Sequence, residues 1–409
     1  MNITMMCPFY YPNLIGGAEV SIKLLAEWLA SNGFIVQVVC FDGKRDSEII
    51  NKVEVKRYPV IANRCLPLPM IANKGLTITL MYSTLKAMRK FEEKTDVYHV
   101  YNVYQTMAAG LYKILGGKKP VVATLNNYAG FCPVVTGTCS ACNEFQARRK
   151  CLFEQTSLLE KPIALAYAAI YPLLTRLAKR IDRYIALSNN VLKLYTRYNF
   201  NPDKIVVVPN FIDIENKNND RTKSTSDNNI FNILYVGAIS KRKGVDILIH
   251  AFKMIDSVKF NVRLTLVGSG ELISYCKFLA KKLQIEDKVA FLDKVEHSKL
   301  EEFYSNADVF VHPARSNEPF GRTLLEALMH DVPCIASDTV SPEIIGDAGM
   351  YFKHEDPEDL AKKLTLFIND KDLQGRLRRS CDKVLRRYEI DLVARRITNV
   401  YSELVKNSG

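Results

Sequence analysis

Residues Glu318-Pro-Phe-Gly-Arg-Thr-Leu-Leu-Glu326 hold two carboxylates eight positions apart. One apolar run ends at His312 before this stretch and another begins at Cys334 after it, a pattern that predicts strand, loop, helix and strand. At a rise of ~1.5 Å per residue the carboxylates lie ~10 Å apart, with the helix N-terminus between them. A helix N-terminus attracts phosphate. The stretch therefore has the outline of a nucleotide-sugar site, in which a pyrophosphate lies between two carboxylates that bind sugar hydroxyls.

The rest of the chain repeats the alternation of strand and helix, which predicts parallel sheets. Residues 1–40 read as a strand, a glycine loop, an amphipathic helix at Val20–Ser31 and a second strand. Further strands are expected at 97–100, 121–125, 184–187, 205–208, 230–236, 263–267, 289–292, 309–312 and 334–336.

A polar segment at 215–229 separates two such series and is expected to be a loop or linker, because nothing in it can build a core. We therefore expect an α/β protein of two Rossmann-like domains, residues 1–212 and 213–391, with a helix at about 392–409 that packs back on the first domain. In open α/β sheets, ligands bind at the carboxyl ends of the strands. The site is accordingly expected in the cleft between the two domains.

Composition limits the functional classes. The 409 residues include 48% hydrophobic and 24% charged residues and carry a formal charge of +12, so anionic substrates, membranes and nucleic acids are all conceivable partners. The cations are scattered, and no nucleic-acid-binding motif with interleaved aromatic residues is present, which argues against nucleic acid.

The first residues form a short apolar strand interrupted by Pro8 and Pro12 rather than a signal peptide. The most apolar later stretch, 162–178, is too short to span a bilayer. We expect a cytoplasmic protein.

Three loops could approach a phosphate. Paired glycines at Gly16-Gly17 follow the first strand and allow close approach of a ligand, although they do not form a dinucleotide fingerprint. The cations Lys241, Arg242 and Lys243 follow the strand that ends at Gly237 and could neutralise a diphosphate, or form an ordinary solvated loop. Gly268-Ser-Gly270 is a further glycine turn at a strand end. Glu326 lies among apolar neighbours, and a partly buried carboxylate needs a partner.

Taken together, these motifs resemble the family 4 retaining glycosyltransferases, which have the two-domain GT-B fold. Gly16-Gly17-Ala-Glu19 matches the N-terminal glycine motif of the family, and Val207-Val-Pro-Asn-Phe-Ile-Asp213 resembles its interdomain segment. Gly237 and Lys243-Gly244 match its phosphate-binding motif, and Glu318 to Glu326 match its Glu-x7-Glu signature.

The resemblance implies an N-terminal acceptor domain, a C-terminal donor domain and a UDP- or GDP-sugar donor, with no cofactor required for catalysis. It implies that Glu318 binds the hydroxyls of the donor sugar and that Glu326 binds the ribose. The diphosphate would be bound by Lys243 and by the backbone of the segment Gly321, Arg322, Thr323 and Leu324. Donor contacts are also implied for the loop glycines Gly17, Gly237, Gly268 and Gly270.

Two positions depart from the family pattern. Ala238 follows Gly237 where the family usually has Arg, and Arg242 or Arg322 could replace that cation. Asn126 takes the place of a histidine in the segment after a first-domain strand. Asn can donate a hydrogen bond but cannot titrate, and in the retaining mechanism the leaving diphosphate can itself take the proton of the acceptor.

Cysteines cluster on the acceptor side. Ten cysteines without a secretion signal argue against a disulfide framework, yet four fall within twenty residues in a C-x6-C-x2-C-x8-C pattern: Cys132, Cys139, Cys142 and Cys151. Such a set suits structural zinc or an iron–sulfur cluster, with thiols packed beneath a loop as the alternative.

Residues 60–91 and 161–183 combine apolar runs with Lys and Arg, as interfacial helices do, although core helices with cationic edges show the same pattern. Together with the net charge they favour peripheral contact with an anionic membrane and a lipid-linked acceptor. The leading interpretation is a retaining glycosyltransferase of surface polysaccharide or glycan synthesis. A sugar-nucleotide epimerase or a phosphorylase of similar fold, and more remotely a nucleic-acid-binding protein, are the alternatives.

Overall fold

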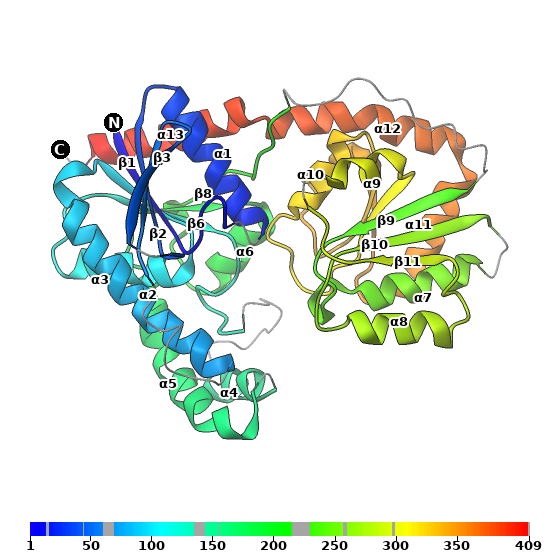
Figure 1. The fold of residues 1–409 in the computed structure, drawn as a ribbon, viewed down its shortest axis with the longest axis horizontal. Coiled ribbons are helices and arrows are strands. Elements are labelled where there is room, and N and C mark those ends of the chain that lie inside the picture. The colour runs from blue at the N-terminus through cyan, green and yellow to red at the C-terminus, as the bar shows by residue number, and fades with distance from the viewer. Residues whose placement is uncertain are drawn as a thin grey trace. The chain divides into compact units, whose positions relative to one another are not determined.

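The computed structural model describes residues 1–13, 16–43, 45–59, 69–134, 144–154, 156–214, 230–256, 260–296 and 299–407. The chain divides into two compact units. Unit 1 comprises Met1–Asn210 and Ile390–Gly409, and unit 2 comprises Phe211–Glu389. Each unit is an α/β layer structure around a parallel sheet (Figure 1).

Unit 1 contains an eight-stranded sheet in the order β3-β4-β2-β1-β5-β6-β7-β8. Its strands are β1 Asn2–Cys7, β2 Ile35–Cys40, β3 Asp46–Ile50, β4 Val53–Arg57, β5 Val97–Val100, β6 Val121–Leu125, β7 Arg183–Ala186 and β8 Ile205–Val207. Its helices are α1 Gly17–Ser31, α2 Pro69–Phe91, α3 Val103–Ile114, α4 Phe145–Phe153, α5 Lys161–Ala178, α6 Asn189–Arg197 and α13 Ile390–Lys406.

The strands of unit 1 are parallel except for the β3–β4 pair. Strands buried by helices on both faces read as continuous apolar runs, and all four residues of β5 are buried. The strand order runs in opposite directions from the central pair β1 and β5. Because parallel crossovers are right-handed, α1 lies on one face of the sheet and α3 on the other. Helix α13 packs against α1, and α2 and α5 pack against α3.

Unit 2 contains a six-stranded parallel sheet in the order β11-β10-β9-β12-β13-β14. Its strands are β9 Phe231–Val236, β10 Val262–Val267, β11 Val289–Leu292, β12 Val309–His312, β13 Cys334–Ser337 and β14 Gly349–Phe352. Its helices are α7 Val245–Asp256, α8 Ile273–Lys282, α9 Leu300–Asn306, α10 Arg322–Met329, α11 Pro357–Asn369 and α12 Lys371–Leu385. Helices α7, α8 and α11 pack together, as do α10 and α12. The sequence expectation of two Rossmann-like sheets is confirmed.

Candidate functional site

The topology of unit 2 marks one place for a ligand. Strands β9 and β12 are neighbours at the centre of the sheet, and from them the strand order proceeds outward in opposite directions. Ligands of open α/β sheets bind at such a switch point, beyond the carboxyl ends of the strands. Two loops leave the sheet there, residues 237–244 after β9 and residues 313–321 after β12.

These two loops bring Lys243 and Glu318 together beside His312, at the end of β12. The Nζ atom of Lys243 lies 2.5 Å from Oε2 of Glu318, and Nε2 of His312 lies 3.3 Å from the same oxygen. Lys243 belongs to the short 3-10 helix Lys241–Lys243, and His312 is the last residue of β12. The sequence singled out Lys243 and Glu318 separately, whereas it marked His312 only as the end of an apolar run, and the structure places all three in one cluster.

The electrostatics of this cluster keep Glu318 ionised. Burial alone would raise the pKa of its carboxyl, but the Lys243 ammonium and the His312 hydrogen bond hold this pKa well below its usual range. Burial, with the nearby Lys243 cation, lowers the pKa of His312 despite its hydrogen bond to Glu318. His312 is therefore neutral at physiological pH, and its Nε2–H donates to the carboxylate.

Arg315 fixes the cationic loop to the end of β12, a role that no sequence pattern indicated. Its guanidinium makes two hydrogen bonds to the Asp246 carboxylate, at 2.8 and 2.7 Å, and a third to the Lys241 carbonyl at 3.0 Å. Its backbone N–H donates to the Arg242 carbonyl at 2.9 Å. Lys243 is the next residue after Arg242 in this loop. Arg315 and Asp246 thereby hold the loop that carries Lys243, although their own side chains do not touch the cluster.

Glycine is required at two close backbone approaches around this site. At Gly244, with φ of +66°, a Cβ atom would lie 2.0 Å from the Pro313 carbonyl oxygen. At Gly268, with φ of +137°, a Cβ atom would lie 1.9 Å from the Gly237 carbonyl oxygen. The turn at Gly268 and Gly270 thus packs against the loop after β9 and supports it.

Helix α10 begins at this site. Gly321 precedes its first residue with φ of +82°, and a Cβ atom there would lie 2.9 Å from Cδ1 of Leu324. The N–H of Leu324 donates to the Gly321 carbonyl at 2.9 Å. The first turn of the helix, where Arg322 and Thr323 lie, follows Glu318 by four positions, as the sequence predicted.

Glu326 lies on the buried side of the same helix. One oxygen accepts a hydrogen bond from Oη of Tyr304 at 3.0 Å, and the other lies 3.5 Å from Nε of Arg322. Arg322 also donates from Nη1 to the Phe211 carbonyl at 2.9 Å. The Arg322 guanidinium is thus engaged with Glu326 and the backbone, whereas Arg242 is exposed. Tyr304 and Arg322 therefore supply the polar partners that the buried Glu326 carboxylate needs. The sequence did not identify Tyr304.

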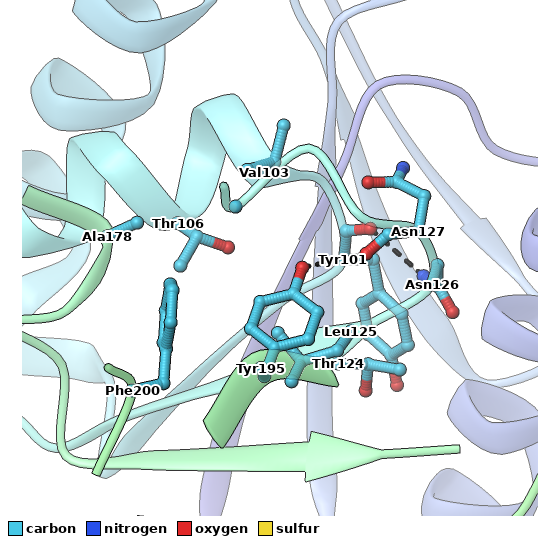
Figure 2. A pocket seen from close by; sticks show the side chains of 11 residues that line it. Tyr101, Val103, Thr106, Thr124, Leu125, Asn126, Asn127, Ala178, Tyr195 and Phe200 are labelled. Atoms are coloured by element: carbon cyan, nitrogen blue, oxygen red, sulfur yellow. Dashed lines mark hydrogen bonds between the residues drawn. The ribbon is translucent and has the colours of Figure 1, made fainter. Parts of the chain in front are cut away.

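Unit 1 carries a small pocket with room for about one water molecule. Figure 2 shows Thr106, Ala178 and Phe200 at one end and the two amides Asn126 and Asn127 at the other. The remaining lining residues are Tyr101, Val103, Thr124, Leu125, Gly130 and Tyr195.

Asn126 follows β6 and is half-buried beside this pocket. Its Nδ2 donates to the Tyr101 carbonyl at 3.0 Å, which fixes the orientation of the amide. Neighbouring Asn127 accepts a hydrogen bond from Tyr195 at its carbonyl oxygen. Asn126 is thus held at the carboxyl end of the sheet, and its contact with an acceptor stays a prediction.

A buried network links the same strand end to α13. His99 of β5 makes hydrogen bonds to Oγ1 of Thr124 at 2.7 Å and to Oη of Tyr401 at 2.5 Å. Burial lowers the pKa of His99 to about 3, so the ring is neutral. Sequence reasoning missed this network because Tyr401 lies 302 positions away.

The glycine loop precedes α1, whose first residue is Gly17. The Gly16 N–H donates to Oε2 of Glu19 at 3.0 Å, so this glutamate caps its own helix. Leu14 and Ile15 lie outside the described residues. Donor contact by Gly17 stays a prediction.

The cysteine cluster lies only partly within the structure. Cys132 is buried in the core of unit 1 and Cys151 is half-buried on α4, while Cys139 and Cys142 fall in the segment that is not described. Among the residues that the structure describes, no group of three or more His, Cys, Asp or Glu side chains is placed to hold a metal ion. The metal stays a prediction, which elemental analysis of the purified protein tests.

Comparison with known families decides the class of protein. Residues 15–216 match the model of Glycosyltransferase Family 4, and residues 216–384 match that of Glycosyl transferases group 1. The chain belongs to these glycosyltransferases. It is therefore a transferase enzyme of GT-B fold, as its sequence motifs indicated.

Curated relatives of this glycosyltransferase are distant. An uncharacterized glycosyltransferase of Methanocaldococcus jannaschii is 26% identical over the whole of both chains. The GPI3 subunit of phosphatidylinositol N-acetylglucosaminyltransferase from Saccharomyces cerevisiae is 23% identical over 100% of this chain and 84% of its own length. The capsular polysaccharide biosynthesis glycosyltransferase CapM of Staphylococcus aureus is 30% identical over 44% of this chain and 48% of its own.

Solved structures share the fold of this glycosyltransferase. Sucrose-phosphate synthase of Thermosynechococcus elongatus superposes with a TM-score of 0.74 at 19% identity, covering 99% of each chain. Anabaena HepE, solved with UDP and glucose, superposes with a TM-score of 0.70 at 16% identity, covering 98% of this chain and 100% of its own.

Proposed function

We propose that this enzyme transfers a sugar, with retention of anomeric configuration, from a UDP- or GDP-sugar to a glycan or lipid-linked acceptor. Unit 2 binds the donor and unit 1 binds the acceptor. The observation that carries the proposal is the cluster of Lys243, Glu318 and the first turn of α10 at the switch point of the unit 2 sheet.

The diphosphate of the donor is bound by a cation and a helix N-terminus. Lys243 supplies an ammonium group, and the first turn of α10 supplies backbone N–H groups and the positive end of the helix dipole. Exposed Arg242 adds a second cation to the same loop, where the family usually has Arg in place of Ala238. The Lys243 ammonium and the N-terminus of α10 stabilise the negative charge that develops on the leaving diphosphate. Most of the rate acceleration comes from this stabilisation.

Glu318 binds the hydroxyls of the donor sugar. Its carboxylate is ionised and accepts hydrogen bonds, as sugar hydroxyls require. In the free protein Lys243 and His312 occupy one of its oxygens, Oε2. The arriving diphosphate draws Lys243 towards itself, and the hydroxyls take the position that Lys243 leaves.

Glu326 binds the ribose of the nucleoside. Tyr304 and Arg322 each contact one of its oxygens and hold the carboxylate in a fixed orientation. A carboxylate offers about four acceptor positions, so capacity for ribose hydroxyls remains. The loop from Gly268 to Gly270 supports the loop after β9 and thereby the phosphate site.

On the acceptor side, Asn126 orients an acceptor hydroxyl without taking its proton, because an amide does not titrate. The leaving diphosphate accepts that proton, as retention of configuration permits. The names of two relatives, a phosphatidylinositol-modifying subunit and a capsular polysaccharide enzyme, support a glycan or lipid-linked acceptor. The enzyme then works in the cytoplasm at the surface of a membrane.

A matched pair of variants tests the donor site. Lys243→Ala removes the proposed phosphate ligand, and Lys241→Ala removes an exposed cation of the same 3-10 turn. Binding of UDP, GDP and a panel of nucleotide sugars is measured by calorimetry, and the anomeric configuration of the product by NMR. We expect Lys243→Ala to weaken nucleotide binding by about tenfold to hundredfold and Lys241→Ala to change it little. Equal affinities in both variants would disprove the assignment, and an inverted product would disprove retention.

A further inference from the structure

Helix α5 exposes an apolar face. Between Lys161 and Arg176 it contains no charged residue. Four large aliphatic side chains on it are more than a third exposed: Ile163 at 36%, Leu165 at 41%, Ile170 at 45% and Leu173 at 59%. Ile163, Ile170 and Leu173 share one stripe at helical spacing, and this stripe borders the buried face of the helix, which includes Tyr167 and Tyr171.

The apolar surface continues on the preceding turn. Leu158 and Leu159 of the 3-10 helix Leu158–Glu160 are 78% and 77% exposed. A surface helix normally shows polar residues on its solvent-facing side, whereas α5 shows aliphatic residues there. Contiguous exposed apolar surface of this kind marks a site of interaction. Helix α4 packs beside α5, and Arg148 ties the two helices together by a hydrogen bond to the Ala168 carbonyl.

A basic hollow lies at the C-terminal end of the same helix. Four cations line it, Arg176 on α5, Lys179 and Arg180 directly after it, and Lys204 before β8. It is an open hollow on the surface, accessible to a phosphate-bearing headgroup.

The charges of this hollow are uncompensated within the described part of the chain. No ion pair described there includes any of the four cations, and Asp182, the adjacent carboxylate in the sequence, pairs with Lys113 at 3.1 Å instead. Lys179 and Lys204 are held in place by backbone carbonyls, those of Tyr198 at 2.7 Å and Ile181 at 2.9 Å. These two cations are thus preorganised for an external anion.

We propose that η3 and α5, Leu158–Glu160 and Lys161–Ala178, form a surface that docks in the plane of an anionic phospholipid membrane. The exposed aliphatic side chains enter the boundary between headgroups and acyl chains, and Arg176, Lys179, Arg180 and Lys204 bind a lipid phosphate. An apolar helical face bordered by cations has the chemistry of an interfacial helix. Among the described residues, no helix is both long enough and apolar enough to span a bilayer.

Charge distinguishes a membrane from a second copy of the chain as the occupant. A symmetric contact between two copies through α5 places the same surface on both partners. The stretch between Lys161 and Arg176 of a second copy offers no anion to these cations, and where the two helices run parallel the cations repel each other. An anionic lipid surface instead satisfies both the apolar face and the cations. The inference is independent of the donor site, so vesicle binding and nucleotide binding can fail separately.

Flotation with vesicles of stated composition tests the proposal. The full chain is mixed at low salt with vesicles of phosphatidylcholine alone or of phosphatidylcholine containing phosphatidylglycerol. We expect binding to the anionic vesicles, weak binding to the neutral ones, and release by salt. Free inorganic phosphate, used as a competitor, should not displace the protein, because it supplies no apolar surface.

Two variants separate the apolar and the basic contributions. Arg176→Gln with Arg180→Gln should weaken binding by roughly 30-fold, since each cation near an anionic surface contributes about fivefold. Ile170→Ser with Leu173→Ser should weaken it by about tenfold or more. The changed side chains are exposed, and thermal melting confirms that each variant folds.

The matched control lies on α8 of unit 2, which also exposes large apolar side chains and ends in cations. Phe278 is 61% exposed, and Lys281 and Lys282 form the last turn of that helix. Phe278→Ser, and Lys281→Gln with Lys282→Gln, should leave vesicle binding unchanged. The proposal is overturned by absence of binding to anionic vesicles, by equal losses in the α8 and α5 variants, or by sedimentation showing a dimer that the α5 variants dissociate.

Discussion

The Lys243 ammonium lies 2.5 Å from the Glu318 carboxylate, although 75 positions separate the two residues in the sequence. Each group is therefore neutralised by the other until a ligand arrives. A nucleotide sugar carries an anion for the lysine and hydroxyls for the glutamate, so it replaces one ion pair with two separate sets of contacts. Because Glu318 and the diphosphate compete for Lys243, removing the Lys243 ammonium should weaken nucleotide binding, whereas removing the Glu318 charge should tighten it.

Glu318→Gln should tighten the binding of UDP while it abolishes most sugar transfer. The amide no longer competes with phosphate for Lys243, but it also loses the negative charge that orients the sugar hydroxyls. Calorimetry with UDP and a transfer assay with the preferred donor measure the two effects. Glu355→Gln, which alters an exposed partner of Arg315, serves as the control. A parallel fall in UDP affinity and transfer would contradict the competition.

Arg315 and Asp246 should act as one unit. Their side chains are partly exposed, at 22% and 16%, so we expect a coupling energy of only about 1 kcal/mol from their bidentate pair. Arg315→Gln, Asp246→Asn and the double variant form the cycle, and urea unfolding is followed by circular dichroism. Nucleotide affinity should fall in all three by similar amounts, because either change releases the loop that carries Lys243. Additive losses would show that Arg315 does not act through Asp246.

Gly244→Ala should destabilise unit 2 by about 3 kcal/mol or more, because the methyl group meets the Pro313 carbonyl oxygen and φ is left-handed. Gly346→Ala also changes a left-handed glycine, with φ of +45°, but its methyl group would lie 3.4 Å from the nearest atom, on Val384. That control should cost about 1 kcal/mol. Thermal melting compares them, and equal losses would show that the loops do not require this close approach.

His99 should make unit 1 less stable in mild acid. The pKa of this histidine is lowered to about 3 in the folded protein, so between pH 7 and pH 5 the unfolded chain binds a proton that the folded chain does not. The free energy of unfolding therefore falls as the pH falls, by about 2 kcal/mol over this interval. Urea titrations followed by the fluorescence of Trp28, the one tryptophan of the chain, report on unit 1.

His99→Gln provides the comparison for this pH dependence. The variant should be less stable than wild type at pH 7, because the hydrogen bonds to Thr124 and Tyr401 change. It should nevertheless lose about 2 kcal/mol less than wild type between pH 7 and pH 5. The same loss in both proteins would assign the acid sensitivity to other groups.

Asn126→Ala should lower the rate of transfer without introducing or removing a step in the pH–rate profile, because the amide does not titrate. Asn126→His, which restores the residue usual in the family, should introduce a step near the pKa of the new imidazole. A basic limb that vanishes on changing Asn126 to Ala would contradict the role assigned to the leaving diphosphate.

Much of the fold could be predicted because its strands are apolar on both faces. The runs at Val97–Val100 and Val121–Leu125 were predicted at the positions where β5 and β6 occur. The hairpin of β3 and β4 was missed for a physical reason. Its turn is made by Asn51 and Lys52, with φ of +48° and +68°, where the sequence signal for such a turn is normally Asn-Gly.

The site was predictable where its residues lie close together in the sequence. Glu318, Gly321 and Glu326 share one strand–loop–helix unit, and their spacing alone indicates the arrangement. Arg315 and Tyr304 could not be found in this way. Their partners Asp246 and Glu326 lie 69 and 22 positions away, and side-chain pairing over such distances leaves no periodic trace in a single sequence.

The hydrogen bond from His99 to Tyr401 has a consequence for synthesis on the ribosome. Translation is vectorial, so the first 210 residues emerge long before the segment from Ile390 that belongs to the same unit. Unit 2 is encoded without interruption and can fold as soon as it has emerged. Unit 1 stays incomplete, with the His99 side chain lacking its final partner, until the last helix leaves the exit tunnel.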